Sequence, residues 1–349
     1  MPHLFCKLVK VSPKSWVFSK LHQVIVIDRR EEVKVSLNIL LTIAAVVLSA
    51  FPIAAQQRAA VSFEATPIEP VVPQVEVPPL LGPNDLANLM TVTTPYIVDI
   101  RSKDARRALF SYEAGHIPGS VNVPYGEWRG LWNDPLSVPT DEELTALIQR
   151  AGLTKTAPIV IAHSSAARGN FGSAAFVYWT LKSVGFDNIA ILNGGVKGWQ
   201  DAGSPMSTKP TPIVPSDLTV TLDKTWLATH EDVDAVLDGT STAQLLDARP
   251  LHQIMENSSL DGSFTLNAEE LVAGEGATAV DDKSIFMRIK KADLDWEFNE
   301  VITYCNNGAL AAVDWFMASE IAEIPNVRIY AHSLSARQKA KELWNKVAN

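Results

Sequence analysis

The chain is poor in cysteine: its 349 residues contain two, Cys6 and Cys305. The His residues are scattered and Cys305 stands alone, so the sequence shows no cluster of metal ligands. A nucleotide-binding glycine fingerprint is also missing, because the segment NGGVKG at residues 193–198 lacks the phosphate-loop spacing. We therefore expect no metal and no cofactor.

Basic residues are outnumbered as well, and the whole chain carries a formal net charge of −9. Residues 1–55 hold seven Lys or Arg and three Asp or Glu, so residues 56–349 keep 23 basic against 36 acidic side chains. Without residues 1–55 the net charge is therefore near −13. This balance argues against nucleic acid or an anionic lipid surface as the main partner.

One long apolar run is present, at residues 35–55. It follows three basic residues and ends in Ala54-Ala55, a pattern typical of an export signal cleaved near Ala55. Residues 1–55 are therefore predicted to be an N-terminal extension and signal peptide of a periplasmic or secreted protein. Two alternatives stay open. The run is just long enough to be an uncleaved membrane anchor, and the long segment before it suggests a translation start near residue 35.

Proline marks two breaks in the rest of the chain. Residues 56–83 contain six prolines without apolar periodicity and are predicted to form an extended linker. A second Pro-rich break, at residues 203–215, separates two predicted domains, at 84–206 and 216–346.

The two halves repeat one another. Four segments of the first half recur in the second in the same order: residues 96–101 and 244–249, 116–124 and 259–267, 158–163 and 301–305, and 188–192 and 326–330. Strands that alternate with helices predict an α/β fold, with a parallel sheet flanked by helices in each half. In such folds ligands bind at the carboxyl ends of the strands.

Cys305 lies at such an end, where an apolar strand gives way to a helix. The free N–H groups and the dipole of a helix N-terminus favour a thiolate there. If Cys6 is removed with the signal, Cys305 is the sole thiol of an exported chain. It is then either buried and inert or kept for its reactivity. We take Cys305 as the best catalytic candidate.

The motifs of the first half resemble the rhodanese superfamily. They are an Asp-x-Arg pair at residues 99–101, GHIPGSVNVP at 115–124 and LNGGVKGW at 192–199. The layout is similar to that of secreted tandem sulfurtransferases of the thiosulfate or 3-mercaptopyruvate type. The resemblance implies two rhodanese-like domains. The first is inactive, because His163 stands where a cysteine is expected, and the second is catalytic.

In that family a cysteine of the C-terminal domain takes a sulfane sulfur from a donor, becomes a persulfide and passes the sulfur to a thiophilic acceptor. The resemblance gives this role to Cys305, with a cradle of backbone N–H groups at Asn306, Asn307, Gly308, Ala309 and Leu310. Arg249 is a further candidate for substrate binding, or else the structural partner of a family acid. The implied partners are a small-molecule sulfur donor and a thiol or cyanide acceptor.

The second half departs from the family pattern. Its GHIPG motif is degraded to SSLDG at residues 258–262, and its closing segment at 331–337 also differs. The cradle holds no Arg or Lys. We therefore expect doubly charged thiosulfate to bind weakly, and 3-mercaptopyruvate or a persulfide to be favoured, unless a base from elsewhere in the cleft restores the charge.

Two other functions use the same fold. A related phosphatase would carry Arg at the sixth residue after the cysteine, where this chain has Ala311. A non-catalytic periplasmic sulfur-carrier or binding module is the remaining alternative, and catalytic turnover separates it from an enzyme.

Overall fold

The computed structural model describes residues 75–104, 110–130, 138–165, 169–274, 278–297 and 299–348, together with three short N-terminal strands. The chain divides into two compact units, Met1–Glu69 and Pro70–Asn349. In the first unit an antiparallel sheet is formed by β1 (Lys10–Ser12), β2 (Ser15–Lys20) and β3 (Gln23–Val26). The predicted signal at 35–55 and Cys6 lie outside the described residues. No helix of the described segments is long and apolar enough to cross a membrane.

The second unit begins with a five-stranded parallel sheet in the order β4-β8-β7-β5-β6. Its elements are β4 (Leu80–Leu81), α1 (Pro83–Val92), β5 (Tyr96–Asp99), β6 (Val121–Asn122), α2 (Asp141–Ala151), β7 (Ile159–Ala162), α3 (Gly169–Ser183), β8 (Ile189–Leu192) and α4 (Gly195–Asp201). Alternate residues of a strand face opposite sides of a sheet. Accordingly, Val160 packs with α1 and α4, whereas Ile161 packs with α2 and α3.

A four-stranded parallel sheet follows, in the order β10-β9-β13-β14. The elements of this half are α5 (His230–Leu237), β9 (Gln244–Asp247), α6 (Leu251–Glu256), β10 (Phe264–Thr265), β11 (Val272–Ala273), β12 (Thr278–Ala279), α7 (Asp282–Lys291), β13 (Val301–Tyr304), α8 (Ala309–Phe316), β14 (Val327–Ile329) and α9 (Ser333–Ala348). A single parallel bridge from Leu227 to Ile329 extends the sheet at the edge that β4 occupies in the first half. The predicted α/β class, with a parallel sheet and flanking helices in each half, is confirmed.

Local sequence signals set several helix ends. The side chains of Thr140 and Glu143 form a reciprocal capping box at the start of α2, and Gly152 ends that helix in the left-handed conformation, with φ of 71°. Asp281 accepts the backbone N–H of Ser284 at the start of α7. These signals lie within a few residues of the ends that they define.

The first sheet begins inside the segment predicted to be linker. Leu80–Leu81 forms the edge strand β4 beside β8, and the N–H of Val77 donates to Asn188 Oδ1 at 3.0 Å. Burial of two leucine side chains against the apolar edge of the sheet stabilises this pairing. The prolines at 78 and 79 are tolerated because the strand lies at the edge of the sheet. α1 then starts at Pro83. Proline lacks a backbone N–H, and the N–H groups of the first helical turn have no partner within the helix, so proline is tolerated there. The described end of the predicted linker is therefore part of the folded unit.

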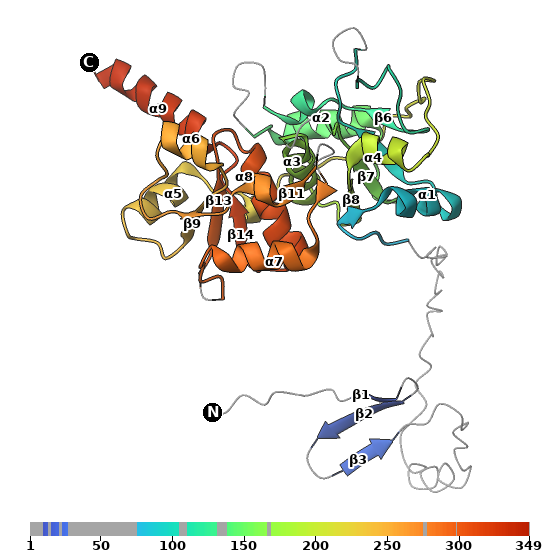
Figure 1. Cartoon of the computed structure of the whole chain (residues 1–349), viewed down its shortest axis with the longest axis horizontal. Helices are drawn as coiled ribbons and strands as arrows, with labels where there is room; N and C mark the ends of the chain where they lie inside the picture. The colour runs from blue at the N-terminus through green and yellow to red at the C-terminus, as the bar shows by residue number, and fades with distance from the viewer. Residues whose placement is uncertain are drawn as a thin grey trace, which may run out of the picture. The chain divides into compact units, whose positions relative to one another are not determined.

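One hydrophobic cluster runs through both halves, and α3 and α8 form its centre (Figure 1). The rings of Phe171 and Tyr178 in α3 both contact Phe316 in α8, with centroids 5.9 and 4.9 Å apart. A methyl group on Gly172 would lie 2.7 Å from the carbonyl oxygen of Ala309, so the two helices approach closely. The N-terminal parts of α3 and α8 are therefore brought together.

Candidate active site

Cys305 follows β13 directly, and a short loop, residues 305–308, connects it to α8; we call this segment the cysteine loop. Gly308 ends the loop with φ of 89°, a left-handed value that glycine adopts without strain. Its N–H donates to Cys305 Sγ at 3.1 Å. Cys305 is a free thiol and is 1% exposed. The sulfur is thus enclosed beside a backbone donor at the start of a helix.

The first turn of α9 binds the cysteine loop through hydrogen bonds to its backbone. The N–H groups of Leu334 and Ser335 donate to the carbonyl oxygens of Cys305 and Asn306, each at 3.0 Å. Ser333 Oγ accepts the N–H of Cys305 at 3.2 Å and donates to the Tyr330 carbonyl oxygen at 2.8 Å. α9 thus binds the carbonyl oxygens of Cys305 and Asn306, while the N–H of Gly308, at the other end of the loop, faces the sulfur.

Ser333 adopts a left-handed conformation, with φ of 55°. The corresponding residue after β8 in the first half is Gly195, with φ of 56°. Such a conformation is strained for serine, and strain of this kind concentrates at functional sites. The sequence analysis missed Ser333. The signal that could have found it is a serine at the position where the first half has its Gly-Gly turn.

Arg249 lies beneath the cysteine loop as part of a fully buried ion pair. Its Nε and Nη2 donate to Asp247, with a shortest distance of 2.7 Å. Nη1 donates to the Asn257 carbonyl oxygen at 2.9 Å and to Asn306 Oδ1 at 3.2 Å, and Nη2 also reaches the Ser258 carbonyl oxygen. The guanidinium donors are thus directed at protein acceptors. Through Nη1, Arg249 also holds the side chain of Asn306.

The remaining residues of the predicted cradle divide into two groups. Asn307 is exposed, and its Oδ1 accepts the N–H of Ala309 at 3.2 Å and lies 4.0 Å from Cys305 Sγ. Ala309 and Leu310 form the first turn of α8 and are partly buried. Within the predicted cradle, the N–H of Gly308 donates to the sulfur, whereas the N–H of Ala309 is bound by Asn307 Oδ1.

His163 occupies the corresponding position at the end of β7. Its side chain is buried, and Nδ1 lies 2.8 Å from the Ser164 carbonyl oxygen. Burial lowers the pKa of His163 to about 4, although hydrogen bonds to backbone oppose the shift, so the imidazole is neutral near pH 7. A neutral imidazole in this position cannot carry a persulfide.

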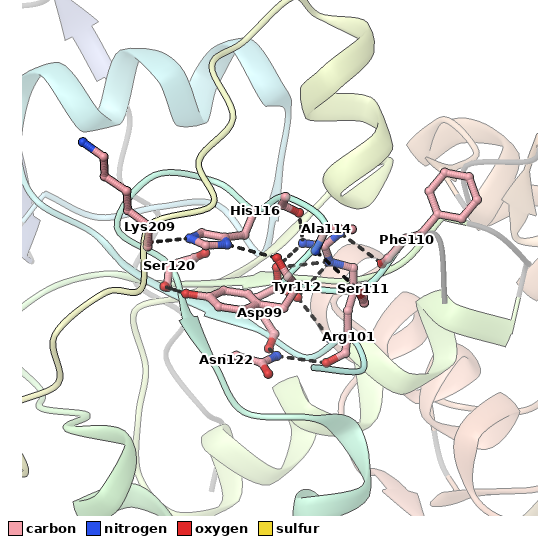
Figure 2. Close-up of polar contacts among 11 residues, drawn as sticks. Asp99, Arg101, Phe110, Ser111, Tyr112, Ala114, His116, Ser120, Asn122 and Lys209 are labelled. Atoms are coloured by element: carbon pink, nitrogen blue, oxygen red, sulfur yellow. Dashed lines mark hydrogen bonds and ion pairs between the residues drawn. The ribbon is translucent and has the colours of Figure 1, made fainter. Parts of the chain in front are cut away.

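The first half repeats the acid–arginine pair, and Figure 2 shows its surroundings. Arg101 donates to both oxygens of Asp99 and to the Gly115 carbonyl oxygen. The ring nitrogens of His116 lie 3.0 Å from the carbonyl oxygens of Tyr112 and Lys209, and its ring stacks on Tyr112 with centroids 3.8 Å apart. These contacts hold the turn that follows β5.

A cation from the first half reaches the cysteine loop. Arg129, which follows the 3₁₀ turn Tyr125–Trp128, donates from Nη2 to the Asn307 carbonyl oxygen at 2.8 Å. Its guanidinium carbon lies 4.3 Å from the centre of the Phe176 ring in α3. The sequence analysis missed Arg129, because nothing in its local sequence connects it with a residue so far along the chain.

Two cavities open at the carboxyl ends of the sheets. The first, of about 480 Å³, is lined by His163 and Tyr125 among others, and the second, of about 420 Å³, by Arg249, Arg288 and Lys291 among others. Cys305 lines neither of them. Within the described ranges no group of three or more His, Cys, Asp or Glu residues could hold a metal ion.

Comparison with known proteins identifies the family. Residues 82–202 match the model of the rhodanese-like domain. A putative thiosulfate sulfurtransferase of Synechococcus elongatus is 25% identical over 248 residues, covering 66% of this chain and 75% of the relative. The thiosulfate sulfurtransferase of Gallus gallus is 24% identical over 243 residues, covering 67% and 81%. Residues 82–202 are thus a rhodanese-like domain, and the similarity to these relatives extends over about two thirds of the chain.

Solved structures of the rhodanese fold are similar to this chain over about three quarters of its length. A 3-mercaptopyruvate sulfurtransferase from Escherichia coli superposes with a TM-score of 0.63 at 20% identity, over 74% of this chain and all of that one. An anaerobic ergothioneine biosynthesis enzyme from Chlorobium limicola gives 0.62 at 17% identity, over 73% of this chain and 67% of that one. The family model stops at residue 202, before the half that holds Cys305. Fold similarity therefore extends beyond the part that sequence similarity to the family model covers.

Proposed function

We propose that this protein is a sulfurtransferase that moves a sulfane sulfur from a small-molecule donor to a thiophilic acceptor through a persulfide on Cys305. The observation that carries the proposal is the contact of 3.1 Å between the Gly308 N–H and Cys305 Sγ at the start of α8. A donor in that position stabilises a negatively charged sulfur. The names of the relatives, thiosulfate and 3-mercaptopyruvate sulfurtransferases, support the same reaction.

The proposed reaction has two steps. With thiosulfate as donor, the Cys305 thiolate attacks the outer sulfur, the S–S bond of the donor breaks, and sulfite leaves with the electron pair. The product is a Cys305 persulfide anion. In the second step cyanide or a thiolate attacks the terminal sulfur, and the Cys305 thiolate departs with the bonding pair. No external oxidant or reductant is needed, because each step exchanges one nucleophile for another.

The surroundings of Cys305 suit both anionic states. A buried charge is costly unless hydrogen bonds compensate for its lost hydration. The Gly308 N–H and the N-terminal end of α8 supply that compensation, and α9 keeps the loop in place. The chain of residues 56–349 contains no other thiol, so the two steps have one possible carrier.

The alternative, a sulfur-carrier module without turnover, requires the persulfide to be offered to a protein partner. A sulfur that is 1% exposed at the end of a buried strand is more accessible to a small molecule than to a thiol on a folded protein. Steady-state turnover with a small acceptor is the measurement that separates the two functions.

Cys305→Ser tests the proposal directly. Serine keeps the size and hydrogen bonding of the side chain, but its hydroxyl does not ionise near neutral pH and its oxygen cannot hold a transferable sulfur. We expect sulfur transfer to cyanide to fall by at least ~10³-fold, with ping-pong kinetics in the unchanged protein. Intact mass after incubation with donor should show an added ~32 Da on the unchanged protein and none on the variant.

His163→Ala is the matched control, because it changes the corresponding position of the other half. We expect it to keep at least about a tenth of the activity, since His163 carries no sulfur. If Cys305→Ser transferred sulfur at a rate close to that of the unchanged protein, the proposed function would fail. A loss in His163→Ala as large as in Cys305→Ser would show that the first half takes part in the chemistry.

We also infer that the protein is exported. The support is the apolar run at 35–55, which lies between basic residues and a Pro-rich segment. N-terminal sequencing of protein from its native source should give a mature N-terminus near Gln56, in a fraction outside the cytoplasm. Recovery of Leu40 in a membrane fraction would instead identify an uncleaved anchor, and intact chain in the cytoplasm would exclude export.

A further inference from the structure

The cysteine loop carries no charge of its own, yet a positive charge lies against it. Residues 305–310 are Cys-Asn-Asn-Gly-Ala-Leu. Arg129 comes from 178 residues earlier in the chain than Asn307, whose carbonyl oxygen accepts its Nη2 at 2.8 Å. The second half has no Arg or Lys in residues 305–310, and Arg129 of the first half provides a positive charge beside them.

Arg129 also contacts the residue that binds the sulfur. A methyl group built on Gly308 would lie 3.3 Å from Arg129 Nη1, so the guanidinium packs against this glycine. The N–H of Gly308 is the donor to Cys305 Sγ. The other face of the guanidinium lies on Phe176, which is fully buried in α3. An aromatic ring and a backbone turn therefore hold the cation against Asn307 and Gly308, two and three positions after Cys305.

Tyr125 lies within electrostatic range of both Arg129 and Cys305. Burial raises the pKa of Tyr125; Arg129 lowers it through its charge and a hydrogen bond, and a negative charge on Cys305 raises it. Tyr125 also lines the cavity of about 480 Å³ in the first half. The cation thus lies beside the cysteine loop and close to Tyr125, one of the residues that line this cavity.

We propose that Arg129 is the specificity-determining residue of the Cys305 site, where it binds the anionic leaving group of the sulfur donor. This inference rests on the proposed function. When the Cys305 thiolate attacks thiosulfate, the outgoing sulfite takes the electron pair of the broken S–S bond, and its oxygens carry the growing charge. Arg129 is placed to receive that charge, and a guanidinium forms strong hydrogen bonds with oxyanions.

The position of Arg129 removes one reason to expect weak binding of thiosulfate. The absence of Arg and Lys from residues 305–310 predicted weak binding of a doubly charged donor. The structure brings Arg129 to the loop from the other half, so that absence no longer argues against thiosulfate. Donors with more negative charge on the leaving group are expected to benefit most.

Two donors that differ by one charge make the test. Thiosulfate, a dianion, leaves as sulfite, and methanethiosulfonate, a monoanion, leaves as methanesulfinate; both give the same Cys305 persulfide. In Arg129→Met we expect kcat/KM for thiosulfate to fall about 10- to 100-fold. The ratio of this value to kcat/KM for methanethiosulfonate should fall at least about fivefold, because the second donor depends less on the cation. Arg129→Lys should restore most of the ratio.

Arg150→Met is the matched control, since it removes an arginine from the same half. Arg150 is exposed and pairs with Glu127, and it should leave the donor ratio unchanged. A structural role of Arg129 would lower the rates for both donors by the same factor. An unchanged ratio in Arg129→Met, whether both rates fall or neither does, would overturn the proposal.

A binding measurement separates this inference from the proposed function. In Cys305→Ser, which cannot accept sulfur, calorimetry should show that adding Arg129→Met weakens thiosulfate binding about tenfold. If the unchanged protein transferred sulfur from neither donor, the proposed function would fail while this comparison still decided the role of Arg129. Equal Kd values with and without Arg129→Met would refute the inference alone.

Discussion

At the scale of single residues, the protein contains two kinds of buried carboxylate. Asp99 and Asp247 end equivalent strands, and each is held by the arginine two residues later. Asp314, in α8, is equally buried, but neither of its oxygens has a hydrogen-bond partner within the described residues. Burial, and secondarily the charge of Asp247, raises the pKa of Asp314 well above its usual value, which favours the neutral form of this carboxyl.

Asp314 therefore makes the protein less stable as pH rises. Above the ordinary pKa of 3.8 the unfolded chain releases a proton that the folded chain keeps, so the free energy of unfolding decreases with pH until the folded carboxyl ionises. Asp314→Asn removes this ionisation. We expect it to differ little from the unchanged protein near pH 4 and to be more stable at pH 7.5, with a gap that grows by at most about 1.4 kcal/mol per pH unit.

Urea denaturation at pH 4.5, 6.0 and 7.5 measures this gap. Asp261→Asn, on an exposed turn, makes the same chemical change without burial and is the matched control. A gap between Asp314→Asn and the unchanged protein that stays constant across the three pH values would contradict the assignment of a neutral Asp314.

At the element scale, the cysteine loop is a junction of β13, α8 and α9. The strand sets the position of Cys305, α8 presents its N-terminal end, and the first turn of α9 takes the loop carbonyls. Gly308 is the point at which these constraints meet. Its φ of 89° excludes an unstrained side chain, and a methyl group there would lie 2.6 Å from the Ala331 carbonyl oxygen.

Gly308→Ala should consequently be costly in both stability and activity. The left-handed conformation alone costs a non-glycine residue about 1–2 kcal/mol, and the collision adds to it. Relief of the collision moves the Gly308 N–H away from Cys305 Sγ, so we expect sulfur transfer to fall at least about tenfold. Denaturation and steady-state kinetics on the same preparation measure the two effects.

Gly262→Ala provides the comparison for Gly308→Ala. Gly262 has φ of 73°, and a methyl group there would meet no atom within 4 Å, so its substitution tests conformational strain without a collision. We expect a stability loss of about 1 kcal/mol and unchanged sulfur transfer. Equal losses of activity in the two variants would show that the Gly308 contact has no special role.

At the scale of the whole unit of residues 70–349, the two halves share one core across α3 and α8. An ion pair reinforces this contact: Lys182 Nζ lies 2.7 Å from Glu320 Oε2, which also accepts the Tyr178 hydroxyl at 2.9 Å. The Glu320 side chain is 6% exposed. The catalytic half and the half that supplies Arg129 are thus fixed to one another by apolar packing and by a largely buried carboxylate.

Glu320→Gln should weaken this contact. The substitution removes the charge opposite Lys182 while keeping the shape, and we expect the free energy of unfolding to fall by about 1–3 kcal/mol. If Arg129 depends on the fixed arrangement of the halves, kcat/KM for thiosulfate should fall in the same variant. Asp201→Asn, which breaks the exposed pair with Lys197, should cost less than about 1 kcal/mol. Equal costs in the two variants would contradict a structural role for the buried pair.

The part of the site that could be predicted is the part encoded by neighbouring residues. Cys305 was found because an apolar strand and a Gly-containing helix start flank it within a few positions. Ser333 was missed because its hydrogen bond to Cys305 spans 28 residues, and Arg129 because its contact with Asn307 spans 178. The predicted linker at residues 56–83 overlaps the first strand, because β4 pairs with β8, a contact between segments about 110 residues apart.

The sequence by itself determined the alternation of strands and helices, the repeat of the two halves, and the presence of a thiol at a strand end in the second half but not in the first. Periodicity, capping residues and turn glycines act over a few positions, so they can be read locally. The tertiary structure alone decided what surrounds that thiol. The packing of α3 on α8 brings Arg129 to the cysteine loop, and the return of the chain after β14 brings Ser333 beneath it. These contacts depend on the mutual fit of surfaces from distant segments, which no local pattern encodes.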